Sequence, residues 1–377
     1  MSFFYRFSKK PSSFVTLPFY PGPVSIPADI RQIFAQDFGP PRMGEEFLHT
    51  YRSAAKNMQK ILYTQNEIVM PTGEGMLGLW GALKSVLKIG DKVVTIGTGV
   101  FGDGFAEMAK SLGCQVEHLS FPHDVTITAN HLNIIEETLR RVQPLALIAV
   151  HCETPSGTLN PLQPLGGLKK QHGVPLFIVD AVSSIGGTPV NADACHVDIV
   201  LGGSQKCLAC PADMSILAIS DVAWHQMQTV QYVGYDALLP FRQASQNVQK
   251  FPYTPNWHGI TALEKSSSNI LAEGLFAVFV RHQNVAVECQ KGLAQLGISL
   301  FPTPEAISSP TVTAAYVPEG FTSSQWQKQL AQQGLIVGKG LGIIQEKIFR
   351  LGHMGPQANL DNLKKALKII RKTISGK

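Results

Sequence analysis

Two apolar runs in the middle of the chain end in side chains that could act together. Leu176 to Val179 runs directly into Asp180, and Ile199 to Leu201 is followed shortly by Lys206. A lysine amine can form a Schiff base with an aldehyde, and a buried carboxylate can pair with a protonated ring nitrogen. These are the two groups that a pyridoxal phosphate enzyme needs. Each alone is common, because Asp also caps helices and turns and a lysine after glycines is often solvated.

Two further segments follow predicted strands and could reach the same ligand, because open parallel sheets bind ligands outside the carboxyl ends of their strands. The turn Thr72-Gly73-Glu74-Gly75 precedes a predicted helix, and its N–H groups could hold a phosphate. Glu74 would repel that phosphate unless it points toward an amine or the ring. Thr154 could reach a phenolic oxygen of the cofactor, or it could belong to a simple turn shaped by Pro155 and Gly157.

The glycine-rich segment from Thr98 to Gly104 has two interpretations. It lacks the G-x-G-x-x-G order of a dinucleotide-binding loop directly after the first strand, so a nicotinamide oxidoreductase is a weak alternative. It could instead present Phe101 to an aromatic cofactor, or be a plain loop with Phe101 in the core.

Near the end of the chain, Arg350 lies inside the apolar run Ile348 to Leu351. A buried arginine is rarely left unpaired. Its planar fork fits a carboxylate, which would belong either to a substrate acid or to an internal Asp or Glu.

These residues depend on an α/β architecture for their positions. Apolar runs alternate with helical patterns, which predicts βαβ units and a mostly parallel sheet covered by helices. We expect strands at 67–70, 92–97, 115–119, 145–150, 176–179 and 199–201, with helices at 27–38, 45–62, 76–87, 105–112, 131–141 and 165–172.

After Asp221 the pattern changes. Residues 224–258 indicate a long connecting segment, and 260–296 is compatible with one continuous helix. Short strands at 311–317, 335–337 and 348–351, with helices at 323–333 and 358–375, predict a smaller α+β domain. We therefore expect an N-terminal arm at 1–22, a large domain at 23–260, and a connector helix with a small C-terminal domain at 261–377.

The composition fits a globular protein of 377 residues, with 44% hydrophobic and 16% charged residues. The net charge of +5 is scattered, so we expect no nucleic-acid partner. No apolar run is long enough to span a bilayer, and the N-terminus lacks a signal-peptide pattern, so we expect a cytoplasmic protein without membrane segments. Six irregularly spaced cysteines suggest reduced, mostly buried thiols. Cys207 and Cys210 form a C-x-x-C without a second pair, so we expect no metal, and a redox pair stays open.

Taken together, these motifs resemble the class V aminotransferases of the fold-type I, pyridoxal-phosphate superfamily. The similarity is greatest to the alanine–glyoxylate and serine–pyruvate branch and covers nearly the whole chain. It begins at Y-P-G-P, is strongest at V-D-A-V-S-S-I-G-G-T-P and G-S-Q-K, and ends at R-L-G-H-M. The resemblance implies a pyridoxal 5′-phosphate cofactor, a small amino donor, and pyruvate or glyoxylate as the 2-oxo acid acceptor.

The resemblance implies a role for each residue around the ring. Lys206 is similar to the lysine that forms the Schiff base and shuttles the proton. Asp180 matches the partner of the pyridinium nitrogen. Phe101 matches the aromatic residue that stacks on the ring, and Thr154 a hydroxyl residue near its phenolic oxygen.

The resemblance also implies how the phosphate and the substrate are held. Thr72, Gly73 and Gln205 match the phosphate cradle. Thr254, in F-P-Y-T-P, matches a threonine that reaches the phosphate of the neighbouring subunit, which implies a homodimer with shared active sites. Arg350 matches the arginine that binds the substrate carboxylate.

Glu74 departs from the branch pattern, which usually has His after the glycine of the phosphate loop. The segments G-E-G-M-L-G-L and R-L-G-H-M-G-P are similar instead to pyridoxamine–pyruvate aminotransferase, which takes free pyridoxamine as amino donor and has an acidic residue at this position. Glu74 would then contact the ring or the donor amine, and free pyridoxal or pyridoxamine would be a substrate.

Within the superfamily, a lyase or desulfurase is a further alternative, although Gln205 stands where those enzymes commonly have His. A non-catalytic binding protein is disfavoured by the intact Asp180 and Lys206.

Overall fold

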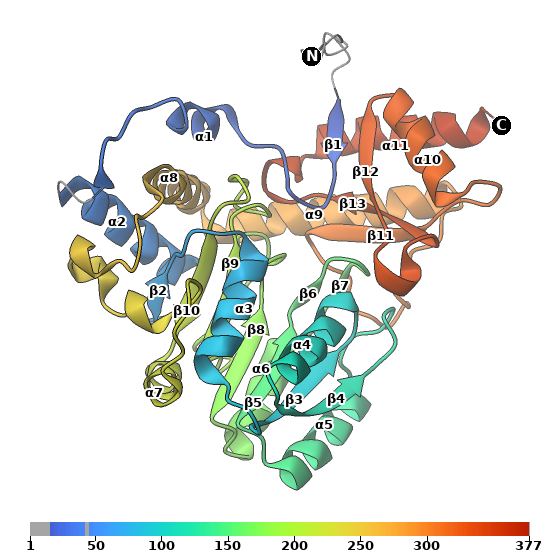
Figure 1. The fold of residues 1–377 in the computed structure, drawn as a ribbon. Coiled ribbons are helices and arrows are strands. Elements are labelled where there is room, and N and C mark those ends of the chain that lie inside the picture. The colour runs from blue at the N-terminus through green and yellow to red at the C-terminus, as the bar shows by residue number, and fades with distance from the viewer. Residues whose placement is uncertain (1–15, 42–44, 377) are drawn as a thin grey trace, which may run out of the picture.

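The computed structural model describes residues 16–41 and 45–376, and Figure 1 shows two sheets with helices packed around them. The larger sheet has seven strands in the order β2-β10-β9-β8-β5-β3-β4. The strands β3 (Lys92–Gly97), β4 (Gln115–Ser120), β5 (Ala146–Val150), β8 (Leu176–Asp180) and β9 (Ile199–Gly203) pair in parallel. The predicted fold class, with a mostly parallel seven-stranded sheet, is confirmed.

The central strands are continuous apolar runs because both faces of the sheet are covered. All five residues of β5 and all five of β8 are buried. In Figure 1, α3 (Gly75–Val86) and α4 (Val100–Ser111) cross the near face of this sheet. The remaining helices of this part are α1 (Ala28–Ile33), α2 (Glu45–Ile61), α5 (Ala129–Val142), α6 (Leu162–Gln171) and α7 (Asp221–Val230).

One edge of the large sheet is antiparallel. The strand β10 (Ser215–Ile219) pairs antiparallel with β9 on one side and with β2 (Glu67–Val69) on the other. The strand β10 and the short hairpin of β6 (Cys152–Glu153) and β7 (Thr158–Leu159) are not predicted from the sequence pattern. Their pairing is decided by partners far away in the sequence.

Three predicted helices differ clearly from the structure. The helix expected at 27–38 is the short α1, which ends at Ile33. The single helix expected at 260–296 is two helices, α8 (Trp257–Glu273) and α9 (Leu275–Gln295). They are separated by Gly274, whose φ of +90° a helix does not accommodate. The helix expected at 105–112 begins earlier, so the glycine-rich segment supplies the first turn of α4 instead of a loop.

The second sheet has the order β1-β12-β13-β11. It combines β11 (Val312–Tyr316), β12 (Leu335–Lys339) and β13 (Ile348–Gly352) with β1 (Leu17–Phe19) from the N-terminal segment. The helices α10 (Ser323–Gln332) and α11 (Leu360–Ser375) pack beside it (Figure 1). Residues 1–15 of the predicted arm lie outside the described residues, and the rest of the arm contains β1. The division into domains stays a prediction.

The cysteines are free thiols, five of them buried and Cys114 partly exposed. Burial raises the pKa of Cys207 and of Cys210 to about 12, so both are held as thiols within the core. None of the helices in the described residues combines the length and the apolar character needed to cross a membrane.

Candidate active site

A pocket of about 120 Å³ lies at the carboxyl ends of the parallel strands. This is where open α/β sheets bind ligands. It is lined by residues from the ends of β8 and β9, the starts of α3 and α4, and the turn after β6. They are Glu74, Gly75, Met76, Leu79, Phe101, Thr154, Asp180, Val182, Ser183, Gln205 and Lys206.

Asp180 stands at the end of β8, at the inner wall of this pocket. Its carboxylate accepts a hydrogen bond of 2.8 Å from the N–H of Val182. Burial raises the pKa of Asp180 to about 6, against the opposing effects of that bond and of Lys206. The group is therefore mostly charged at neutral pH, and a cationic group in the pocket would stabilise that charge.

Lys206 follows β9 and faces Asp180 across the pocket. Its amine donates a hydrogen bond to the carbonyl of Pro21, which belongs to the segment between β1 and α1. Burial, and after it the charge of Arg350, lowers the pKa of Lys206 to about 8. A substantial fraction of the amine is thus neutral near physiological pH, as a nucleophile or a general base requires.

The Y-P-G-P segment packs directly on Lys206. A Cβ on Gly22 would lie 2.5 Å from Cδ of Lys206, and the φ of +94° at this position also favours glycine. The N–H of Val24 donates to the carbonyl of Gln205 at 3.0 Å. The sequence by itself indicates no role for this segment, although its Pro-Gly-Pro run marks a constrained turn.

Thr154 connects the pocket with Arg350. Its hydroxyl hydrogen-bonds to that of Ser183, and its carbonyl accepts from Nη1 of Arg350 at 3.2 Å. Nε of Arg350 donates to the carbonyl of Lys339 at 2.7 Å. Arg350 is only 4% exposed, yet it pairs with no carboxylate in the part of the chain that the structure describes. An internal salt bridge therefore does not explain this arginine.

Glu74 caps α3 and lines the same pocket. Its carboxylate accepts from the N–H of Met76 at 3.0 Å and from Nε2 of Gln205 at 3.2 Å. The chain thus places its own anion at a helix N-terminus that could otherwise hold a phosphate. The other carboxamide atom of Gln205, Oε1, is buried and has no hydrogen-bond partner.

The other predicted phosphate contacts lie outside the pocket lining. The N–H of Thr72 donates to Oη of Tyr253 at 3.1 Å, and Gly73 has a φ of +129° in the turn beside it. Thr254 is exposed at the surface of the same subunit. The structure brings Lys206, Asp180, Phe101, Thr154, Gln205 and Glu74 together in one pocket. Thr72, Gly73, Thr254 and Arg350 are not part of its lining, and Arg350 is joined to it through the carbonyl of Thr154.

The arrangement fits a pyridoxal-type ring. Asp180 would hold the ring nitrogen, Phe101 would form a wall against the ring, and the Lys206 amine would reach the aldehyde carbon. The unpartnered Oε1 of Gln205 offers an acceptor to a ligand in the same pocket. The position of a phosphate is less well matched, because the carboxylate of Glu74 occupies one of the amides at the start of α3, that of Met76.

Comparison with known proteins agrees with this geometry. The family model described as aminotransferase class-V matches residues 39–352. The chain belongs to the class-V aminotransferase family. Its fold and its pyridoxal 5′-phosphate chemistry are those of fold-type I aminotransferases, and it is an aminotransferase.

Several relatives cover most of this aminotransferase. Pyridoxamine–pyruvate transaminase of Mesorhizobium japonicum is 32% identical over 82% of this chain and 79% of its own length. Alanine–glyoxylate aminotransferase of Oryctolagus cuniculus is 27% identical over 94% of this chain and 91% of its own. The crystal structure of pyridoxamine–pyruvate aminotransferase from Mesorhizobium loti superposes with a TM-score of 0.91 at 27% identity, covering 98% of this chain and 94% of that one.

One buried acid escaped the sequence analysis. Glu153 precedes Thr154 and is fully buried, with its carboxylate directed at the start of α4 instead of into the pocket. An acidic residue three positions after the buried strand β5, in a segment of otherwise uncharged residues, is a signal that could have singled it out, because a buried charge needs a specific partner.

Proposed function

We propose that this aminotransferase moves an amino group to a small 2-oxo acid such as pyruvate or glyoxylate, with Lys206, Asp180 and Arg350 as the working residues. The observation that carries the proposal is the arrangement around Thr154. This residue lines the pocket that holds Lys206 and Asp180, and its carbonyl orients the guanidinium of Arg350. A buried arginine without a carboxylate partner beside a lysine of lowered pKa suits a substrate acid.

Each residue has a separable task. Pyridoxal 5′-phosphate, when bound, supplies an aldehyde for the donor amine and a ring that accepts electrons from the substrate α-carbon. Asp180 keeps the proton on the ring nitrogen. The neutral amine of Lys206 takes the proton from the substrate α-carbon. Arg350, held by the carbonyls of Lys339 and Thr154, binds the carboxylate and fixes which substrate bond faces Lys206.

The active site is completed, in our proposal, by a second copy of the chain. Thr254 is exposed and does not line the pocket of its own subunit, as expected if it serves the partner's phosphate site. Sedimentation of the purified protein tests the dimer, and Thr254→Ala tests the contact through weaker cofactor retention. A monomer that turns over at the full rate would contradict this part. The cytoplasmic location stays a prediction of the sequence.

A second candidate concerns the amino donor, which we propose to be free pyridoxamine. The specific observation is the carboxylate of Glu74 at the N-terminus of α3, bonded to Met76 and Gln205. A donor without a phosphate leaves these contacts intact, whereas a phosphate would compete with Glu74 for them. The relative named pyridoxamine–pyruvate transaminase supports this candidate.

The visible absorption spectrum of the purified protein distinguishes the two candidates. An amino-acid donor with bound pyridoxal phosphate predicts a yellow protein that bleaches with alanine or serine. Pyridoxamine as donor predicts a colourless protein that turns yellow only with pyridoxamine and pyruvate together, as pyridoxal forms. A spectrum that responds to none of these would refute the aminotransferase assignment of the site.

The other chemistries considered from the sequence are not supported by the site. A desulfurase needs an accessible reactive thiol, whereas Cys152 is buried and burial raises its pKa to about 11. A nicotinamide dinucleotide would need the amides at the start of α4, which Glu153 already occupies.

A further inference from the structure

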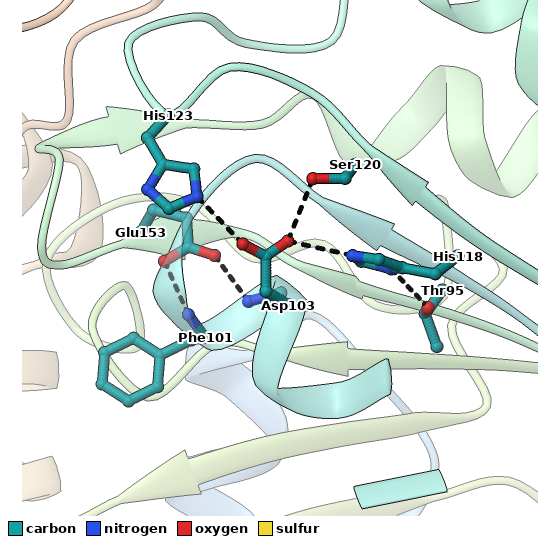
Figure 2. Close-up of polar contacts among 8 residues, drawn as sticks. Thr95, Phe101, Asp103, His118, Ser120, His123 and Glu153 are labelled. Carbon is teal, nitrogen blue, oxygen red and sulfur yellow. Dashed lines mark hydrogen bonds and ion pairs between the residues drawn. The ribbon is translucent and has the colours of Figure 1, made fainter. Parts of the chain in front are cut away.

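The glycine-rich segment that opens α4 is built around a carboxylate of this chain. Glu153 accepts hydrogen bonds from the N–H groups of Gly102 at 2.7 Å and Phe101 at 3.2 Å. Figure 2 shows both bonds converging on the first turn of the helix. Helix N-termini carry unpaired N–H groups and the positive end of the helix dipole, and here Glu153 accepts from two of these groups.

The glycines of this segment make room for that carboxylate. A Cβ on Gly99 would lie 2.5 Å from Cδ of Glu153, which no side chain could accommodate without a shift. A Cβ on Gly102 would lie 2.7 Å from the backbone oxygen of Ile96 and 3.2 Å from Oε1 of Glu153. The motif therefore receives an internal glutamate and not the phosphate of a ligand.

The backbone of Phe101 is bound by Glu153 on the side away from the pocket. Its ring lines the pocket, whereas Glu153 does not. In Figure 2 the ring points away from Glu153 and from Asp103. The backbone of the residue that forms the ring wall is thus fixed by a buried side chain outside the pocket.

We propose that Glu153 is a positioning residue for the cofactor ring, because it binds the first amides of α4 and thereby fixes the plane of Phe101. The proposal rests on the proposed function, since it takes Phe101 as the wall against which the ring stacks. Glu153 contacts neither substrate nor cofactor and acts through Phe101.

The neighbouring polar cluster does not perform the same task. Asp103 bonds to Nε2 of His118 at 3.0 Å and to Nε2 of His123 at 2.9 Å. These contacts tie α4 to β4 and the segment that follows it, without reaching the Phe101 amide (Figure 2).

Burial, then the charges of Asp180 and Asp103, raise the pKa of Glu153 to about 8. Both carboxyl oxygens keep lone pairs whether the group is protonated or ionised. Glu153 can therefore accept from the N–H groups of Phe101 and Gly102 in both states.

Glu153→Gln tests the proposal, because an amide has one accepting atom and one donating NH₂ and leaves one backbone N–H unserved. The readouts are the dissociation constant for pyridoxal 5′-phosphate, from an absorbance titration, and the visible circular dichroism of the bound ring. We expect binding to weaken at least about tenfold and the dichroic band to change. Glu107→Gln, an exposed position on the same helix, is the matched control and should change neither.

A double-mutant cycle with Phe101→Leu separates positioning from general destabilisation. If Glu153 acts through Phe101, the losses of cofactor affinity from the two variants do not add. Once Phe101→Leu has removed the aromatic ring, Glu153→Gln can no longer misplace it. If Glu153→Gln does not fold, Glu153→Asp, which withdraws the carboxylate from the amides, is measured with the same expectation.

Two results would overturn the inference: wild-type affinity and dichroism in the Glu153 variant, or additive losses in the cycle. Either result leaves the proposed function intact as long as the wild-type protein itself binds the ring. A wild-type protein that binds neither pyridoxal nor its phosphate would instead refute the proposed function, and this inference with it.

Discussion

The charge of Glu74 offers the sharpest test of how the site treats a phosphate. Glu74→Gln keeps the size of the side chain and an oxygen that can accept from the N–H of Met76, but it removes the negative charge. A phosphate bound at this helix N-terminus would take the amide that Oε1 of Glu74 now binds at 3.0 Å. The two anions would therefore be immediate neighbours.

The cost of that approach follows from Coulomb's law. Two unit charges about 4 Å apart repel by about 1 kcal/mol in water and by about 4 kcal/mol at an effective dielectric constant of about 20. Glu74 is partly exposed. We therefore expect about 2 kcal/mol, which corresponds to a change of about thirtyfold in a dissociation constant.

The assay compares the dissociation constants of pyridoxal and pyridoxal 5′-phosphate by absorbance titration. Glu74→Gln should shift their ratio by about thirtyfold in favour of the phosphate, with more of the shift at low ionic strength. It should also weaken the preference for pyridoxamine as donor more than it changes the KM of the oxo acid. Glu107→Gln controls for a change of net charge. An unchanged ratio would refute the reasoning.

Three further outcomes are expected. Lys206→Ala should lower kcat by several orders of magnitude, measured by oxo-acid formation, because the nucleophile and the base are one residue; near-normal turnover would refute the site assignment. Arg350→Lys should chiefly raise the KM of the oxo acid, since a point charge replaces a planar fork, and an unchanged KM would make Arg350 structural. The rate at which cofactor-free protein captures pyridoxal should rise with pH through about 8, because the neutral amine of Lys206 accumulates above its lowered pKa. Arg350→Met should move that midpoint to higher pH, as stopped-flow absorbance would show, and a pH-independent rate would contradict the assignment.

Much of the fold was predictable because it is local. The strands β3, β5 and β8 are mostly apolar runs, because helices cover both faces of the sheet. The helices α4 and α5 between them bury residues at helical spacing. Residue 274 shows the limit of that reasoning. Its neighbours on both sides continue the helical pattern, and the break between α8 and α9 comes from the backbone conformation of a single glycine.

The sequence by itself determined the chemistry, because the order of apolar run and polar residue places Asp180 and Lys206 at strand ends. Tertiary structure decided the surroundings that tune them. Three hydrogen-bonded contacts join segments far apart in the chain: Glu153 with the start of α4, the carbonyl of Pro21 with Lys206, and the carbonyl of Thr154 with Arg350. Such contacts have no periodic signature, since they depend on which strand ends meet at one edge of the sheet.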